Sequence, residues 1–428
     1  SNNPHSIDFR AMIKPLHRFM PAGFYYKTFI KQKVWSIVED RLRSLSGFSK
    51  APSVTDEDVY DHIFQHTEVL VIGGGVAGMS AALEVLSGSK VARVILVDER
   101  ENLGGELTNE FTTDQTATLW FQEAKGKLQK YRDEDNSRLK ILTSATAYAW
   151  YDHNYIEVLQ THGTGQSMVH ESGQTARKVL HKIRTKEVIL ATGAHERPML
   201  FETNDLANIM LSQSVRRYIN EFNVVAGKEI VLYGNNDSIY NTAIDLSKHN
   251  IKSKVVDVRA SGNESEIILE AKKIGIEVFQ AFAVLKAKGK SRVTGVEISQ
   301  VEMQAKPPHW KSKWRITGDT KTINCDLLAT SGGFNPVVHL DCHCGGKTYF
   351  DETSQSFLPQ KERKERQVCG AVNSVGFWKD AMIDAKNKAQ LTLSSLGEEV
   401  EVTPQKLTNR SHNYFNVDQF FTPLEILN

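Results

Sequence analysis

Hydrophobic positions along the chain change their spacing near residue 68. From there to about residue 395, short runs rich in Val, Ile and Leu alternate with stretches of helical periodicity, the pattern of parallel α/β folds. Residues 1–65 show no clear alternation, apart from a helix predicted from Thr28 to Leu45 with apolar residues on one face. The spacing therefore predicts an α/β region, preceded by a segment that packs on the following domain or on a partner.

Within the α/β region, the runs and their polar separators predict individual elements. Lys125–Arg138 is charged enough for a surface helix, and Thr161–Arg177 is typical of a hairpin loop. Short buried strands are predicted at Val69–Ile72, Val94–Val97, Val188–Leu190, Ile230–Tyr233 and Lys254–Val256.

The strongest local signal directly follows the first of these strands. Gly73, Gly75 and Gly78 fit G-x-G-x-x-G, with Val76 and Ala77 between the last two, and a helix is predicted from Met79 onward. The first glycine permits a tight turn, the second lets the backbone approach a pyrophosphate, and the third lets helix and strand pack closely. Because a helix N-terminus also attracts phosphate, the motif predicts a dinucleotide site.

An acidic residue at the end of the next strand strengthens this interpretation. Asp98 lies about 20 residues after Gly78, the interval of dinucleotide-binding units, and can accept hydrogen bonds from the adenosine ribose. Glu99 is the close alternative. A bare glycine motif is often only a turn, but strand, helix, second strand and acid in order favour nucleotide binding.

Two further glycine turns favour FAD over NAD at this first site. Gly104 and Gly105 follow the acid, and a predicted strand ends at Ala191-Thr192-Gly193, where chain and dinucleotide again come close. The predicted cofactor-binding residues of the first site are Gly73, Gly75, Val76, Ala77, Gly78, Asp98, Glu99, Arg100, Gly104, Gly105, Glu106, Ala147, Ala191, Thr192, Gly193 and Arg197.

A second strand–helix–strand unit follows, with a degenerate loop. Its candidate residues are Gly234, Asn235, Asn236, Asp237 and Ser238, with Asp257 as the terminal acid. Asparagine stands where the second glycine belongs, which makes close approach to a phosphate harder, although polar side chains could compensate. Two interpretations stay open: NAD(H) binding and a vestigial fold element. The acid favours NAD over NADP, while Arg259 leaves a case for the phosphate.

The chain then returns to the first domain through two more glycine-containing turns. Gly332 ends the second unit, and Gly370-Ala371 precedes a helix predicted from Trp378. In many flavoproteins of this architecture an Asp occupies the position of Ala371 and binds the cofactor. Backbone N–H groups and the helix N-terminus are the alternative donors here.

Taken in order, these motifs resemble a known family. GGGVAG, VDERENLGG, ATGAHERP, GNNDS and SGGFNPVVHL, together with RFMPAGFYYKTFI near the start, look like the alpha subunit of heterotetrameric sarcosine oxidase. The resemblance runs over most of residues 15–395. It implies FAD at the first glycine loop, NAD at the second, and a relationship to two-component amine and imino-acid dehydrogenases. In that family the amine is oxidised on a separate subunit, and the family's N-terminal ferredoxin-like and C-terminal folate-binding regions have no counterpart here.

Composition narrows the function classes further. Lys and Arg number 52 against 51 Asp and Glu, so no global attraction to nucleic acid or anionic membrane is expected. No apolar run is long enough for a membrane span, and no signal peptide is predicted. Four Cys do not make a disulfide framework, which favours the cytoplasm, or the mitochondrial matrix of a eukaryote. His339, Cys342, His343 and Cys344 are too closely spaced to share one tetrahedral ion, so no metal site is predicted.

The sequence therefore predicts an α/β flavoprotein with two dinucleotide-binding domains, of the glutathione-reductase type. The expected FAD domain covers residues 66–205 and 325–395, interrupted by an NAD-binding-like domain at 206–324 and followed by a tail at 396–428. The expected function is that of an FAD-containing subunit, passing hydride or electrons within a hetero-oligomeric complex that oxidises amines or imino acids. A repurposed, non-catalytic subunit is the alternative, and no general base is evident.

Overall fold

The computed structural model describes residues 59–110, 114–135, 137–161, 176–262, 265–304, 313–360, 365–400, 402 and 404–408, together with Trp35 and Glu39. The chain divides into two units, Ser1–Asp58 and Val59–Asn428. Trp35 and Glu39 are helical, and the rest of the helix expected over 28–45 lies outside the described residues. The second unit contains two lobes.

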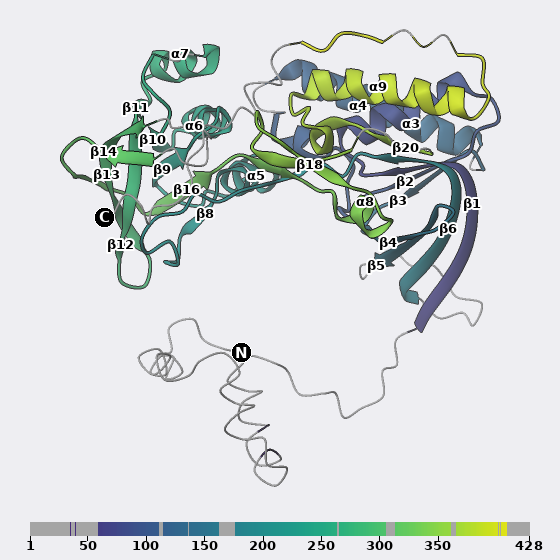
Figure 1. Ribbon diagram of the computed structural model, residues 1–428, viewed down its shortest axis with the longest axis horizontal. Coiled ribbons are helices and arrows are strands. Elements are labelled where there is room, and N and C mark those ends of the chain that lie inside the picture. The colour runs from purple at the N-terminus through teal and green to yellow at the C-terminus, as the bar shows by residue number, and fades with distance from the viewer. Residues whose placement is uncertain are drawn as a thin grey trace. The chain divides into compact units, whose positions relative to one another are not determined.

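The first lobe is built on a seven-stranded sheet ordered β3-β2-β1-β6-β5-β4, with β20 paired to β6. Strands β1, β2, β3, β6 and β20 run parallel, while β5 pairs antiparallel with both β6 and β4. Helices α3, α4 and α9 lie together on one face of the sheet (Figure 1). The bounds are β1 Val59–Ile72, β2 Val94–Val97, β3 Leu139–Leu142, β4 Ala145–Tyr151, β5 Tyr155–Thr161, β6 Ala176–Leu190, β20 Arg366–Val368, α3 Val76–Gly88, α4 Gln115–Glu134 and α9 Trp378–Ser395.

Strand β1 shows how its sequence pattern fixes this arrangement. Val69 and Val71 pack with the helices, whereas Leu70 and Ile72 belong to the core beneath β4 and β5. Its earlier part alternates between half-buried and exposed residues and pairs with β6 from Val59 onward. The boundary expected at residue 65 therefore falls inside this strand, because a one-sided strand lacks the continuous apolar run that marks a buried one.

The second lobe combines a parallel sheet, ordered β11-β10-β9-β16-β8, with an antiparallel sheet of β12 to β15. Because β16 pairs with β9, this lobe extends to Ser331 and the boundary expected at 324 is corrected. Its elements are β8 Ile209–Leu211, α5 Ser212–Phe222, β9 Glu229–Gly234, α6 Ser238–Lys248, β10 Lys252–Asp257, α7 Glu266–Lys273, β11 Glu277–Gln280, β12 Phe282–Gly289, β13 Val293–Gln304, β14 Lys313–Ile316, β15 Lys321–Asn324 and β16 Leu327–Ser331.

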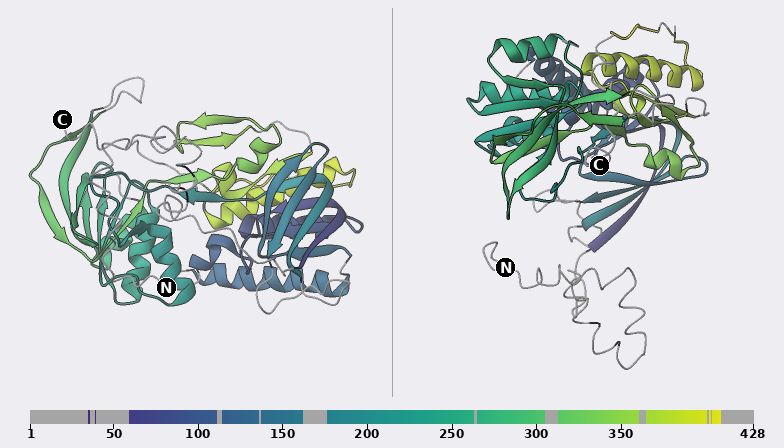
Figure 2. Two further views of the ribbon diagram at one scale, coloured as in Figure 1. Left: turned by 90° about the horizontal axis from the view of Figure 1, so that it is seen from below. Right: turned by 60° about the vertical axis from the view of Figure 1, so that its left-hand side comes forward.

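A pair of short antiparallel strands joins the lobes, as two further views show (Figure 2). The chain leaves the first lobe through β7 (Ala194–Glu196) and returns through β17 (Phe334–Pro336). The remaining elements are η2 Gly105–Glu110, α8 His339–His343, β18 Thr348–Asp351, β19 Ser356–Pro359 and η4 Gly370–Asn373. None of the helices in the described ranges is long and apolar enough to cross a membrane.

Arg216 of α5 holds the lobes against each other. Its Nε donates to Asp245 Oδ2 of α6 at 2.5 Å, while Nη1 and Nη2 donate to the two carboxylate oxygens of Glu110 in η2 at 2.8 and 3.1 Å. Asn220 adds a second link, donating to Asp245 Oδ2 and to the Asn109 carbonyl oxygen. The guanidinium is almost inaccessible to solvent, so this ion pair is a buried one.

We expect Arg216→Leu to destabilise the protein by about 3–5 kcal/mol, because Asp245 would be left buried without its cation. The neighbouring Arg217→Leu is the matched control. It removes a more exposed i,i+4 pair with Glu221 and should cost only about 0.3–0.5 kcal/mol. Urea denaturation of both variants measures the difference in the free energy of unfolding. Equal losses of that free energy would contradict the role of Arg216 in holding the lobes together.

Candidate functional site

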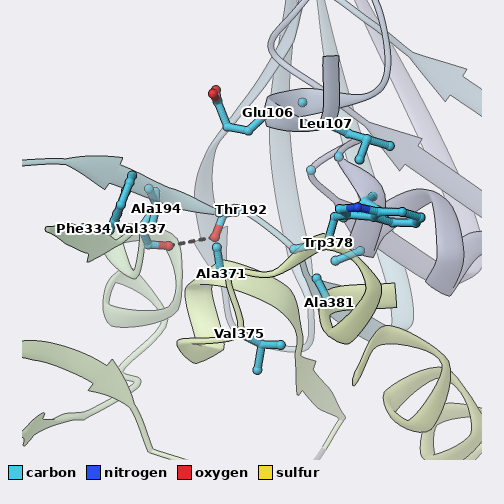
Figure 3. A pocket seen from close by; sticks show the side chains of 18 of the residues that line it. Glu106, Leu107, Thr192, Ala194, Phe334, Val337, Ala371, Val375, Trp378 and Ala381 are labelled. Atoms are coloured by element: carbon cyan, nitrogen blue, oxygen red, sulfur yellow. Dashed lines mark hydrogen bonds between the residues drawn. The ribbon is translucent and has the colours of Figure 1, made fainter. Parts of the chain in front are cut away.

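A cavity of about 1330 Å³ lies between the carboxyl ends of the first lobe's parallel strands and the second lobe. This exceeds the roughly 300–1,000 Å³ of sites for drug-sized ligands and suits an elongated one. Residues of η2, of the turn after β6 and of α9 surround it (Figure 3). The second lobe contributes residues of α5, α6 and α7.

The structure gives a different physical reason for the absence of a side chain at each of the three glycines of the first loop. At Gly73 the backbone has φ +107°, and a Cβ would lie 2.1 Å from the Ala191 carbonyl oxygen. At Gly78 a Cβ would lie 1.7 Å from the Gly73 carbonyl oxygen. At Gly75 the atom nearest to a Cβ would be Gly105 Cα, 3.9 Å away, and Gly75 lines the cavity. Internal packing therefore requires the first and third glycines, while the second leaves room for a ligand.

Helix α3 presents an uncapped N-terminus to that space. It begins at Val76 with Gly75 as its N-cap, no side chain caps it, and its first turn has no acidic residue. Val76 and Ala77 both line the cavity. The first N–H groups and the positive end of the helix dipole therefore form an anion site.

The two acidic candidates after β2, Asp98 and Glu99, differ in burial and in their hydrogen bonds. Asp98 is buried, and its carboxylate accepts hydrogen bonds from the Gly74 N–H at 2.5 Å and the Arg100 N–H at 2.7 Å. Burial raises the pKa of Asp98, while these two N–H groups oppose that shift. Both Asp98 and Glu99 line the cavity, and Glu99 is exposed. Asp98 thus organises the glycine loop, and Glu99 has the more accessible carboxylate.

The second glycine turn touches the first. Gly104 (φ +120°) donates its N–H to the Gly74 carbonyl oxygen at 2.9 Å. A Cβ on Gly105 (φ +56°) would lie 3.0 Å from Gly75 Cα. The cavity wall beside this turn carries an ion pair between Arg100 and Glu106, and Ala147 of β4 lines the cavity as well.

The third glycine turn follows β6. Ala191 donates its N–H to the Ile72 carbonyl oxygen at 2.8 Å, which ties the turn to β1. Thr192 Oγ1 donates to the Val337 carbonyl oxygen at 2.8 Å (Figure 3), and Gly193 has φ +74° with nothing within 4 Å of a Cβ. These three residues line the cavity.

Two candidate residues have internal roles instead. Arg197 does not line the cavity; its Nη1 donates to the Gln355 carbonyl oxygen at 2.6 Å, and burial lowers its pKa. Gly332 is also away from the cavity, and a Cβ there would lie 2.9 Å from the Pro198 carbonyl oxygen. Arg197 therefore binds the backbone at Gln355, and Gly332 allows close packing against Pro198. A sequence motif cannot distinguish such roles from ligand binding.

The last turn has Ala371 where many flavoproteins have an Asp, and a carboxylate of α9 binds its backbone. Ala371 lines the cavity, and Gly370 (φ +76°) donates its N–H to Asp384 Oδ2 of α9 at 2.9 Å. Trp378, at the start of α9, also lines the cavity and donates its Nε1–H to Asp114 Oδ2 at 3.1 Å. The sequence pattern missed this indole as a site residue, because an aromatic residue at a helix start has many packing roles.

A buried carboxyl lies at the joint between the lobes. Glu196 of β7 accepts a hydrogen bond from the Gln213 N–H at the start of α5, at 2.8 Å. Burial raises the pKa of Glu196 to about 8, although that N–H group favours ionisation. The carboxyl is therefore mostly protonated at neutral pH and adds little charge beside the cavity.

The second glycine loop is placed differently from the first. Gly234, Asn235, Asn236, Asp237 and Ser238 are all buried, and of these only Asp237 lines the cavity. Asp257 is fully buried and does not line the cavity either. The residues predicted for the second nucleotide site therefore lie close together, but most of them are not accessible to a ligand from the cavity.

Comparisons with known proteins agree with this architecture. The family model for pyridine nucleotide-disulphide oxidoreductases matches residues 67–359. Among solved structures, L-proline dehydrogenase from P. horikoshii is 20% identical with a TM-score of 0.56, covering 84% of this chain and 63% of that one. Thioredoxin reductase from T. acidophilum is 18% identical with a TM-score of 0.53, covering 78% and 99%.

Sequence similarity extends to a more specific group. Sarcosine oxidase subunit alpha from Corynebacterium sp. (strain U-96) is 32% identical over 369 residues, covering 85% of this chain but 36% of the relative. The chain thus spans about a third of the length of that relative. The predicted fold and the resemblance to sarcosine oxidase alpha subunits are confirmed, and the chain belongs to the pyridine nucleotide-disulphide oxidoreductase family.

Proposed function

We propose that this chain is the FAD-binding redox subunit of a complex that oxidises amines or imino acids, of the sarcosine oxidase type. The observation that carries the proposal is the uncapped start of α3. Here a cavity large enough for a dinucleotide is lined by Gly75, which has no side chain to fill the space. The family and the redox names of its relatives support a flavin over other dinucleotides.

The described residues suit the successive parts of FAD. The first N–H groups of α3 would hold the diphosphate, and Glu99 would accept hydrogen bonds from the adenosine ribose. The start of α9, with Ala371 and Trp378, lines the cavity farther along and would contact the rest of the cofactor. Bound FAD would supply hydride and one-electron chemistry, while the protein supplies binding, orientation and electrostatics.

Partner subunits are proposed because the relative in the sequence comparison is named as a subunit, and this chain covers about a third of it. We therefore place substrate chemistry on the complex, with this chain accepting or passing electrons.

Gly75→Val should weaken FAD binding by more than about 100-fold, which corresponds to about 2.8 kcal/mol, because the branched side chain would occupy the diphosphate position. The apoprotein should fold normally, since the nearest protein atom to that Cβ, Gly105 Cα, is at a van der Waals distance of 3.9 Å. Gly126→Val in α4, where a Cβ meets nothing within 4 Å, is the control and should keep its flavin. Flavin absorbance and fluorescence titration measure the affinity; a folded Gly75→Val protein with wild-type flavin content would refute the site.

The two acids should respond differently to amide substitution. Glu99→Gln should lower FAD affinity by about 10-fold without changing the stability of the apoprotein, because only a ligand contact is weakened. Asp98→Asn should lower apoprotein stability as well, since its carboxylate accepts hydrogen bonds from the glycine loop. Thermal melts of the flavin-free proteins, paired with FAD titrations, separate these effects. Loss of stability in the Glu99 variant would reverse the assignment.

The FAD-loaded chain alone should turn over sarcosine or proline far more slowly than about 1 per second, the low end of ordinary enzymes. Native material should elute in size-exclusion chromatography with at least one other polypeptide, and that fraction should oxidise an amine. Enzyme-like rates from the isolated chain would contradict the need for a partner. A purified complex whose flavin no amine reduces anaerobically would instead support the non-catalytic subunit.

A further inference from the structure

The second strand–helix–strand unit, β9–α6–β10, repeats the layout of β1–α3–β2. Both units place a loop at the carboxyl end of the first strand and an acid at the end of the second. Gly73, Gly75, Val76 and Ala77 of the first loop line the cavity, whereas all five residues of the second loop are buried and, of these, Asp237 alone lines it. The polar groups of the two loops also have different partners.

In the second loop, a side chain occupies the place that a diphosphate would take. Asn236 stands at the second glycine position, and its Oδ1 accepts from the Ser238 N–H at 3.0 Å and from Ser238 Oγ at 2.6 Å. Its Nδ2 donates to the carbonyl oxygen and Oγ of Ser331, at 3.2 and 3.0 Å. Neither α3 nor α6 has a side-chain bond from its N-cap residue, but the Ser238 N–H at the start of α6 is already bound by Asn236 within the protein.

The terminal acid of the second unit is also fully engaged. Arg259 Nε and Nη2 donate to the two Asp257 carboxylate oxygens at 3.0 and 2.8 Å, and the Arg259 N–H adds a bond of 2.9 Å. Tyr240 donates its hydroxyl to Asp257 Oδ2 at 2.7 Å. Asp257 is completely buried, so a ribose could reach it only by displacing Arg259 from a buried ion pair.

Arg259 extends this closure to the loop itself. Its Nη1 donates to Asp237 Oδ1 at 2.7 Å, so one guanidinium links the start of α6 to the end of β10. Although burial works against its charge, the carboxylates of Asp257 and Asp237 raise the pKa of Arg259. A ribose phosphate of NADP would therefore have to compete with two internal carboxylates for this cation.

The cavity wall that the second lobe provides has an unsuitable charge for a diphosphate. Asp237, Glu266 and Glu270 line it. Among the lining residues described for this lobe, Arg216 is the cation, and it is held by Glu110 and Asp245. A dinucleotide crossing this wall would lie beside carboxylates rather than beside an available positive group.

We infer that the second unit is closed: Asn236 and Arg259 fill from within the chain the positions that would recognise a diphosphate and a ribose, so it binds neither NAD(H) nor NADP(H). The nicotinamide dinucleotide that the fold family implies does not fit these residues. The inference rests on the second unit alone and holds whether or not the flavin proposal does. Its consequence for that proposal is that electrons enter and leave without a nicotinamide bound in the second unit.

The direct test is titration of the FAD-loaded protein with NAD⁺, NADH, NADP⁺ and NADPH into the millimolar range, by calorimetry and by NADH fluorescence. We expect no saturable binding by any of the four. A Kd below about 1 mM, equivalent to about −4.1 kcal/mol, that weakens in Asp257→Asn would overturn the inference. Flavin content is measured in the same samples, so failure of the FAD proposal would be seen separately.

A second measurement tests the closing side chains by their structural role. Arg259→Ser should lower the melting temperature clearly, because two carboxylates lose their shared cation. Arg217→Ser, which removes an exposed pair, is the control and should change it little. A wild-type melting temperature for Arg259→Ser would overturn the inference, because the guanidinium would then not be fixed over Asp257.

Discussion

The close approach of two backbone turns governs the site. Gly73 lies so near the Ala191 carbonyl oxygen that a Cβ would be 2.1 Å from it, and the Ala191 N–H is bonded to Ile72. This contact fixes the carboxyl ends of β1 and β6 side by side, because neither turn can move without losing it. The start of α3, the turn at Gly104 and the cavity between the lobes all take their positions from that pair of strands.

The two strand–helix–strand units illustrate how little of a binding site is contained in a fold. Each has parallel strands, a connecting helix and an acid at the same place. In the first, Asp98 lines the cavity, its carboxylate accepts the Gly74 N–H, and the start of α3 stays open. In the second, Asn236 and Arg259 direct their polar groups inward, and every residue of the loop is buried. Side chains, not topology, decide which unit can accept a ligand.

The joint between the lobes relies on polar contacts that are almost excluded from solvent. Arg216 brings together Glu110 and Asp245, while Glu196 on the connecting strand accepts a hydrogen bond from the start of α5. A buried arrangement of this kind favours one relative placement of the lobes, since any other would leave charges without partners. The width of the cavity between the lobes depends on that placement.

The sequence by itself determined the order of strands, helices and glycine turns, because the hydrophobic period is set by neighbours a few residues away. The need for glycine at Gly78 is local as well, since a Cβ there would meet the Gly73 carbonyl oxygen. It also indicated the family to which the motifs belong, and Ala191, Thr192 and Gly193, which it predicted to bind a cofactor, line the cavity. Only the tertiary structure decided which polar groups face the cavity. Arg197 turns to Gln355, and Asp384 supports Gly370; each pair joins residues separated along the chain. Such partners meet only when the chain is packed, since a buried polar group bonds to whatever donor or acceptor lies nearest in space.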